Sequence, residues 1–168
     1  MKRIVLTVLA LIFVASLTTA KDTKIGIIIS QRIMEEYPEA QDAQKVLSDE
    51  IAEWQRQSQQ MQDEIMEKEK EYMQMELMLS EEKKMEKQAE LERDYTEFRQ
   101  FQSGIEQKAF QRNQELFQPI NEKIQKVIDE IAVEMSFDLI LDAVGNNIAY
   151  ADPTLDITDR VLDELKRQ

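Results

Sequence analysis

The sequence predicts an α+β fold in which a long antiparallel coiled-coil hairpin of helices emerges from a small β-sheet head. Three observations lead to this prediction. Between Pro38 and Pro119 the chain contains a single glycine, and its apolar residues recur in alternating steps of four and three, as in a coiled coil. This spacing changes phase near residues 80–88. A segment rich in β-branched residues, which favour strands, precedes the helical region, and two further candidate strands follow it.

Two apolar series define the arms of the expected hairpin. A single rod through the change of phase would be about 120 Å long, whereas a fold back gives two arms of nearly equal length. We therefore expect a coiled-coil hairpin over 39–118 with its tip near 80–84. A register shift in one continuous helix is the alternative, because the tip segment has neither glycine nor proline. The first series is Leu47, Ile51, Trp54, Ser58, Met61, Ile65, Lys68, Tyr72, Met75 and Leu79, and the second is Leu91, Tyr95, Phe98, Gln102, Ile105, Ala109, Arg112 and Leu116.

The head is expected to combine the two ends of the exported chain. Its first part, residues 21–38, should contain a buried strand over 24–29. The partner of this strand should be a β-hairpin formed by 138–144 and 148–151, which are separated by the turn residues Gly145-Asn146-Asn147. If the first strand joins that hairpin, the helical segment must leave the sheet and return to it, which also favours two helical arms.

The remainder of the head, within 119–168, is the end of the second long helix and a C-terminal helix that begins near Asp159. Thr158 should cap this helix, and Ile157 should pack onto Leu162. A head of about three strands and a short helix has little core of its own. We therefore expect several chains to associate and to cover the edges of the sheet.

The first twenty residues have the features of a signal peptide. Basic Lys2 and Arg3 precede an apolar run over 4–14, and small residues lead up to Ala20. We expect cleavage after Ala20, so that residues 1–20 are absent from the exported protein. A membrane anchor is the alternative, but the apolar run is too short to cross a bilayer comfortably.

Composition excludes several classes of function. After cleavage the chain has a net charge of about −15, which argues against nucleic acid as a partner because phosphates would be repelled. The absence of histidine and cysteine excludes imidazole catalysis, thiol chemistry and most zinc sites. We expect no cofactor, no metal site and no enzymatic activity. Glutamates interspersed with Lys83, Lys84 and Lys87 leave membrane contact weak or absent.

Several short motifs resemble those of the Skp/OmpH-like periplasmic chaperones. The motifs are Ile25-Gly26, Ser30-Gln31-Arg32-Ile33, Glu36-Tyr37-Pro38-Glu39-Ala40, Leu141-Asp142, Tyr150 and Asp156-Ile157-Thr158. The resemblance implies a periplasmic homotrimer in which three hairpins hang from a barrel-like β body and enclose a cavity. It also implies an ATP-independent holdase activity toward unfolded outer-membrane proteins.

This chain departs from the family pattern in two respects. Ile27 and Ile29 stand where members usually carry an aromatic and an acidic residue, and the chain is acidic whereas the best-known member is basic. We do not extend lipid or lipopolysaccharide binding to this protein. A structural coiled-coil spacer or adaptor of the cell envelope, which would bind one folded partner, is the alternative function.

Apolar residues outside the two series are the expected client-binding residues, since they have no partner within a two-helix hairpin. They are Met66, Met73 and Met78 on the first arm and Phe101 and Phe110 on the second. Methionine suits this role because it is unbranched and polarisable. The alternative is that these side chains widen the contact between the arms or touch a neighbouring arm.

Overall fold

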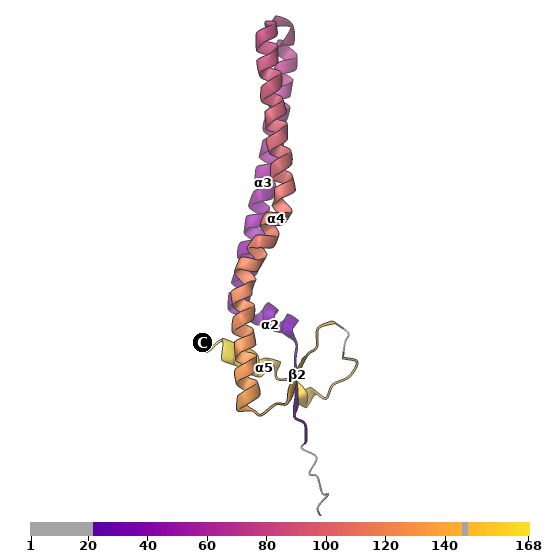
Figure 1. The fold of residues 1–168 in the computed structure, drawn as a ribbon, viewed down its shortest axis with the longest axis vertical. Helices are drawn as coiled ribbons and strands as arrows, with labels where there is room; N and C mark the ends of the chain where they lie inside the picture. Colours follow the sequence, from indigo (N-terminus) through magenta and orange to yellow (C-terminus); the bar gives the residue numbers. More distant parts are fainter. Residues whose placement is uncertain (1–21, 146–147) are drawn as a thin grey trace, which may run out of the picture.

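A computed structural model describes residues 22–145 and 148–168. Two long helices rise side by side from a small head at one end of the molecule (Figure 1). The described elements are β1 (Ile25–Ile28), α2 (Ser30–Glu36), α3 (Pro38–Met75), the 3-10 turn η1 (Glu76–Met78), α4 (Glu81–Glu134), β2 (Leu139–Asp142), the 3-10 turn η3 (Pro153–Leu155) and α5 (Thr158–Leu165). The predicted combination of long helices with a small sheet is confirmed.

The bend between α2 and α3 follows from the local sequence. Pro38 restricts the residue before it to extended conformations, and Tyr37 has φ −79° and ψ 119°. Proline is also favoured in the first turn of a helix, where its missing N–H costs nothing. The chain therefore ends α2 at Glu36 and starts α3 in a new direction.

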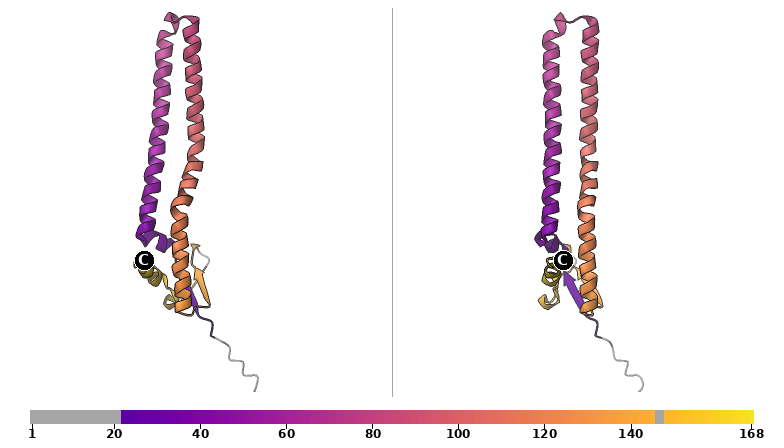
Figure 2. Two further views of the ribbon diagram at one scale, coloured as in Figure 1. Left: turned by 60° about the vertical axis from the view of Figure 1, so that its left-hand side comes forward. Right: turned by 90° about the vertical axis from the view of Figure 1, so that its left-hand side faces the viewer.

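The face of α3 predicted to meet the second arm does so along most of its length. Leu47 and Ile65 are buried, and the other members of the first series are partly buried with one exception. The exception is Met75, which is exposed. Figure 2 shows the two arms running side by side from the head to the tip.

Two positions of the second series do not face α3 as predicted. Tyr95 and Gln102 are exposed, whereas Asp94 and Phe101 are partly buried. Asp94 is drawn toward α3 because its carboxylate binds Lys68, with 2.6 Å between Nζ and Oδ2. Phe101 then occupies the same face two turns later.

Polar contacts fix the antiparallel register of the arms. Residue numbers on α3 rise as those of their partners on α4 fall, so Leu47 lies near Leu116 as expected. The contact of Tyr72 with Gln88 places Met75 nearer the start of α4 than its predicted partner, Leu91. The contacts join Glu39 to Lys123, Glu50 to Arg112, Lys68 to Glu90 and Asp94, and Tyr72 to Gln88.

The tip lies slightly earlier in the chain than predicted. α3 ends at Met75, and the turn runs through η1 to Ser80, so residues 81–84 already form the first turn of α4. The Ser80 hydroxyl accepts a hydrogen bond from the backbone N–H of Lys83 at 3.4 Å and caps α4. A serine cap replaces the glycine or proline that the predicted tip lacked.

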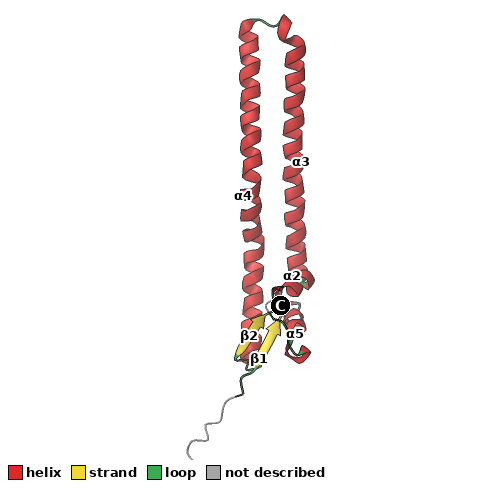
Figure 3. Ribbon diagram, turned by 90° about the vertical axis from the view of Figure 1, so that its right-hand side faces the viewer, coloured by secondary structure: helices red, strands yellow, loops and turns green. Residues whose placement is uncertain are grey.

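The sheet of the head differs from the prediction. β1 pairs with β2 in parallel, from Ile25 opposite Leu139 to Ile28 opposite Asp142 (Figure 3). The predicted β-hairpin is wrong, because 148–151 is irregular among the described residues; Asn146 and Asn147 lie outside them. The long α2 to α4 excursion returns the chain in its original direction, as a parallel pair requires.

The core of the head lies where α2, the start of α3, the end of α4 and α5 meet. Its largest fully buried side chains include Ile33, Tyr37, Val127, Ile131 and Leu165. These residues come from α2, the bend between α2 and α3, α4 and α5, which bring distant parts of the chain together. Packing among them positions the base of both arms.

The start of α5 is capped differently from the prediction. Thr158 is the first helical residue and is fully buried, and its hydroxyl accepts a hydrogen bond from the backbone N–H of Ile29 at 3.0 Å. Asp156 takes the capping role, since its Oδ1 accepts from the N–H of Thr158 at 2.8 Å. Ile157 and Leu162 both belong to the core, as expected.

Candidate binding surface

Exposed apolar side chains gather on the part of the hairpin farthest from the head. We define the distal apolar surface as Met66, Met73, Leu77, Met78 and Met85, which are between 50% and 97% exposed. Three of these residues, Met66, Met73 and Met78, were predicted from the sequence. Leu77 was missed because the end of α3 could not be located, and Met85 was passed over although it also lies outside both apolar series.

Helix geometry places these side chains where the other arm does not cover them. Met66 and Met73 are seven residues apart and lie on one face of α3, next to the inward-facing Ile65 and Tyr72. α3 ends at Met75, and the 3-10 turn then carries Leu77 and Met78 around the end of the hairpin. The surface therefore extends from the side of α3 onto the tip.

The two predicted phenylalanines of α4 differ from one another. Phe110 is largely exposed, so its ring is available to a partner. Phe101 is partly buried on the face toward α3, and the Lys108 ammonium lies 4.8 Å from its ring centroid. Phe101 thus has packing contacts within the hairpin that Phe110 lacks.

A polar layer crosses the hairpin close to Met66. Lys68 Nζ lies 2.8 Å from Glu90 Oε1 and 2.6 Å from Asp94 Oδ2. Hydrogen bonding to Asp94 and then to Glu90 raises the pKa of Lys68, and the bond from Lys68 lowers the pKa of Glu90. Both shifts favour the charged forms of Lys68 and Glu90, and the contacts of Lys68 with Glu90 and Asp94 join the two arms.

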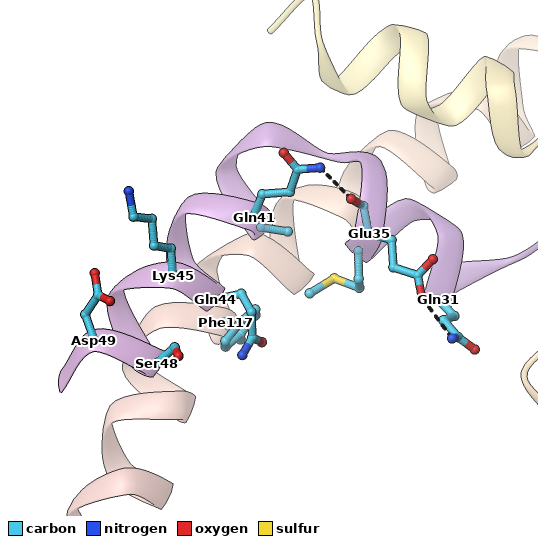
Figure 4. Close-up of a pocket in the computed structure, with 10 residues that line it drawn as sticks. Gln31, Glu35, Gln41, Gln44, Lys45, Ser48, Asp49 and Phe117 are labelled. Carbon is cyan, nitrogen blue, oxygen red and sulfur yellow. Dashed lines mark hydrogen bonds between the residues drawn. The ribbon is translucent and has the colours of Figure 1, made fainter. Parts of the chain in front are cut away.

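A groove of about 590 Å³ lies on the head at the bend between α2 and α3 (Figure 4). Met34 and Phe117 provide apolar contacts in it, and glutamines form much of its rim. Within this rim, Gln31 Nε2 donates to Glu35 Oε1 at 2.9 Å, and Gln41 Nε2 donates to the Glu35 carbonyl at 2.6 Å. The sequence did not predict this groove, because it depends on the bend and on a residue of α4.

The described residues, 22–145 and 148–168, lack two kinds of site. No group of three or more acidic residues converges to hold a metal ion. No helix in this part of the chain is long and apolar enough to span a bilayer. The predicted signal peptide lies outside the described residues.

Comparisons with known proteins agree with the fold. The family model for outer membrane proteins of the OmpH-like type matches residues 24–165, so the chain belongs to the OmpH-like family. A crystal structure of a candidate OmpH-like outer membrane chaperone from Caulobacter crescentus CB15 superimposes with a TM-score of 0.77. That protein is 14% identical in sequence, and the match covers 86% of this chain and 85% of the other, which shows a shared fold. No curated protein matches the sequence.

Proposed function

We propose that the exported chain is a periplasmic, ATP-independent holdase that binds unfolded outer-membrane proteins and prevents their aggregation. Membership of the OmpH-like family supports a chaperone role, and the similar Caulobacter structure belongs to a candidate outer membrane chaperone. The observation that carries the proposal is the distal apolar surface, which a long hairpin holds away from the head.

The chemistry of this surface suits an unfolded client. Methionine side chains are flexible and polarisable, so Met66, Met73 and Met78 adapt to apolar segments of different shapes. Each such contact contributes about 1 kcal/mol to the binding free energy. A client held by many weak contacts is bound and released without an energy source. No covalent step and no nucleotide are needed.

Homotrimeric assembly is part of this proposal. The sheet in the described residues has two strands, and β2 carries exposed Leu139 and Leu141. An exposed strand edge with apolar side chains favours association with another chain. The resemblance implies three copies, so three hairpins would surround a shared space in which one client is kept from meeting another.

The periplasmic location rests on the signal peptide predicted for residues 1–20. Cleavage after Ala20 would release a chain that starts at Lys21, shortly before β1. N-terminal sequencing of the exported protein tests this point, with Lys21 as the expected first residue.

The test of holdase activity is replacement of Met66, Met73 and Met78 together with glutamine. The variant should protect an unfolded β-barrel protein from aggregation less well, with helicity and oligomeric mass nearly unchanged, because these side chains are exposed. A matched control replaces Gln57, Gln60 and Gln74, which are exposed on α3, with alanine. Unchanged protection by the methionine variant would place client binding elsewhere.

The groove on the head favours a second candidate function, that of an envelope adaptor with one folded partner. Its volume of about 590 Å³ accommodates a few side chains of such a partner. Phe117→Ala would then abolish partner binding and leave protection of unfolded clients intact. For a holdase, the variant of Met66, Met73 and Met78 loses protection of unfolded clients, whereas Phe117→Ala keeps it.

A further inference from the structure

The distal half of the hairpin carries a marked excess of negative charge. Residues 61–98 contain thirteen acidic and six basic side chains, so this segment has a net charge of −7 within a chain of net charge −13. The distal apolar surface lies entirely within this segment. A client that reaches the methionines must therefore enter an anionic environment.

Ion pairing within the hairpin engages most of the cations and few of the carboxylates. Four of the six cations, Lys68, Lys83, Lys84 and Lys87, pair with carboxylates of the hairpin itself. Nine of the thirteen carboxylates form no ion pair among the described residues. The charge that remains for a partner is thus mostly negative.

Three of the unpaired carboxylates are close to the exposed methionines in sequence. Glu67 follows Met66 directly, and Glu71 and Glu76 lie on either side of Met73 in sequence. All three glutamates are exposed. Charges interact over about 8 Å at physiological ionic strength, so a segment that contacts these methionines is within range of the carboxylates.

We infer that the distal apolar surface selects unfolded segments in which apolar residues alternate with lysine or arginine. This inference rests on the proposed holdase function and names the class of segment that is bound. Methionines supply adaptable apolar contacts, and the neighbouring glutamates attract cationic side chains and repel anionic ones. The choice among client segments then depends on their charge, while the apolar contacts place no restriction on their shape.

The experiment compares two fluorescent, unstructured peptides of equal length and equal apolar content, one with lysines and one with glutamates at the intervening positions. Their dissociation constants for the full exported protein are measured by anisotropy at low and at high salt. We expect the lysine peptide to bind roughly tenfold more tightly at low salt, with the difference shrinking at high salt.

Two variants with the same net charge locate the effect. One carries Glu67→Gln, Glu71→Gln and Glu76→Gln beside the methionines. The other carries Asp42→Asn, Glu106→Gln and Asp163→Asn, which are exposed, form no ion pair among the described residues, and lie outside 61–98. The first should lose most of the preference for lysine, and the second should keep it.

The outcomes separate this inference from the proposed function. Equal affinities for the two peptides, or tighter binding of the glutamate peptide, overturn charge selection even if protection of an unfolded barrel protein persists. Equal loss of the preference for the lysine peptide in the two variants also overturns charge selection, because net charge alone would then be responsible. If the unmodified protein binds neither peptide and gives no protection, the holdase function itself fails.

Discussion

Lys68 of α3 and Asp94 of α4 join the two arms of the hairpin, with 2.6 Å between Nζ and Oδ2. Glu90 completes the contact, with its Oε1 2.8 Å from the same nitrogen. The lysine occupies a position that an apolar residue would fill in a regular coiled coil. Its two carboxylate partners come from one face of α4, so this contact fixes both the phase and the register of the second arm.

Acid should weaken the hairpin through this contact. The bond from Lys68 lowers the pKa of Glu90 below its ordinary value of 4.5. Because the pKa is lower in the folded state, Glu90 stabilises the fold above pH 4.5, and this stabilisation is lost as the pH falls through the folded-state pKa.

Thermal unfolding of Glu90→Gln, followed by circular dichroism from neutral pH to about pH 3, measures this loss. The variant should be less stable than the unmodified protein at neutral pH, and the difference should vanish in acid. Glu92→Gln is the control, since Glu92 is exposed and forms no ion pair among the described residues. A difference between Glu90→Gln and the unmodified protein that persists at low pH would contradict the assignment.

The head should be sensitive to loss of buried side chains at the base of α4. Ile131 is 1% exposed and Val133, two residues later, is 82% exposed. Ile131→Ala should lower the free energy of unfolding by about 3 kcal/mol, since it leaves a cavity among four helices. Val133→Ala should change it by less than about 0.5 kcal/mol. Urea unfolding measures the free energy of unfolding of both variants. Similar decreases in the two variants would show that the base of α4 is packed differently.

Two glycines should respond in opposite directions to alanine. Gly104 lies inside α4, where an added Cβ meets nothing within 4 Å, so Gly104→Ala should raise the free energy of unfolding by about 1 kcal/mol. At Gly26 the added Cβ would lie 3.2 Å from both Ile157 Cδ1 and Phe137 Cε1. Gly26→Ala should therefore lower the melting temperature, and stabilisation by this change would contradict the close packing of β1.

The helical part of the fold was accessible from the sequence because coiled-coil spacing is local information. The α3 series from Leu47 to Leu79 predicted the inward face, with Met75 as the exception. The α4 series failed at Tyr95 and Gln102, since the phase there depends on Asp94 meeting Lys68 across the hairpin. Such a contact between arms leaves no signal in the spacing of apolar residues.

The sheet was predicted less well, because β-branched segments do not reveal which strands pair or in which direction. β1 and β2 pair in parallel, and Ile157 N–H donates to the Ile27 carbonyl at 2.8 Å from outside any strand. The candidate surface was predicted at the three methionines beside the first series. The exposure of Leu77 depends on where α3 ends, and the groove at Phe117 depends on the bend at Tyr37. Neither the helix end nor the bend can be predicted from the spacing of apolar residues.

Mass measurement of the exported protein, alone and with an unfolded outer-membrane protein, tests the proposed holdase most directly. Light scattering and native mass spectrometry report oligomeric state and client stoichiometry together. The proposed mechanism predicts a trimer that binds one unfolded client in a soluble complex without ATP. A protein that stays monomeric at micromolar concentration, or that leaves the client to aggregate, would contradict it.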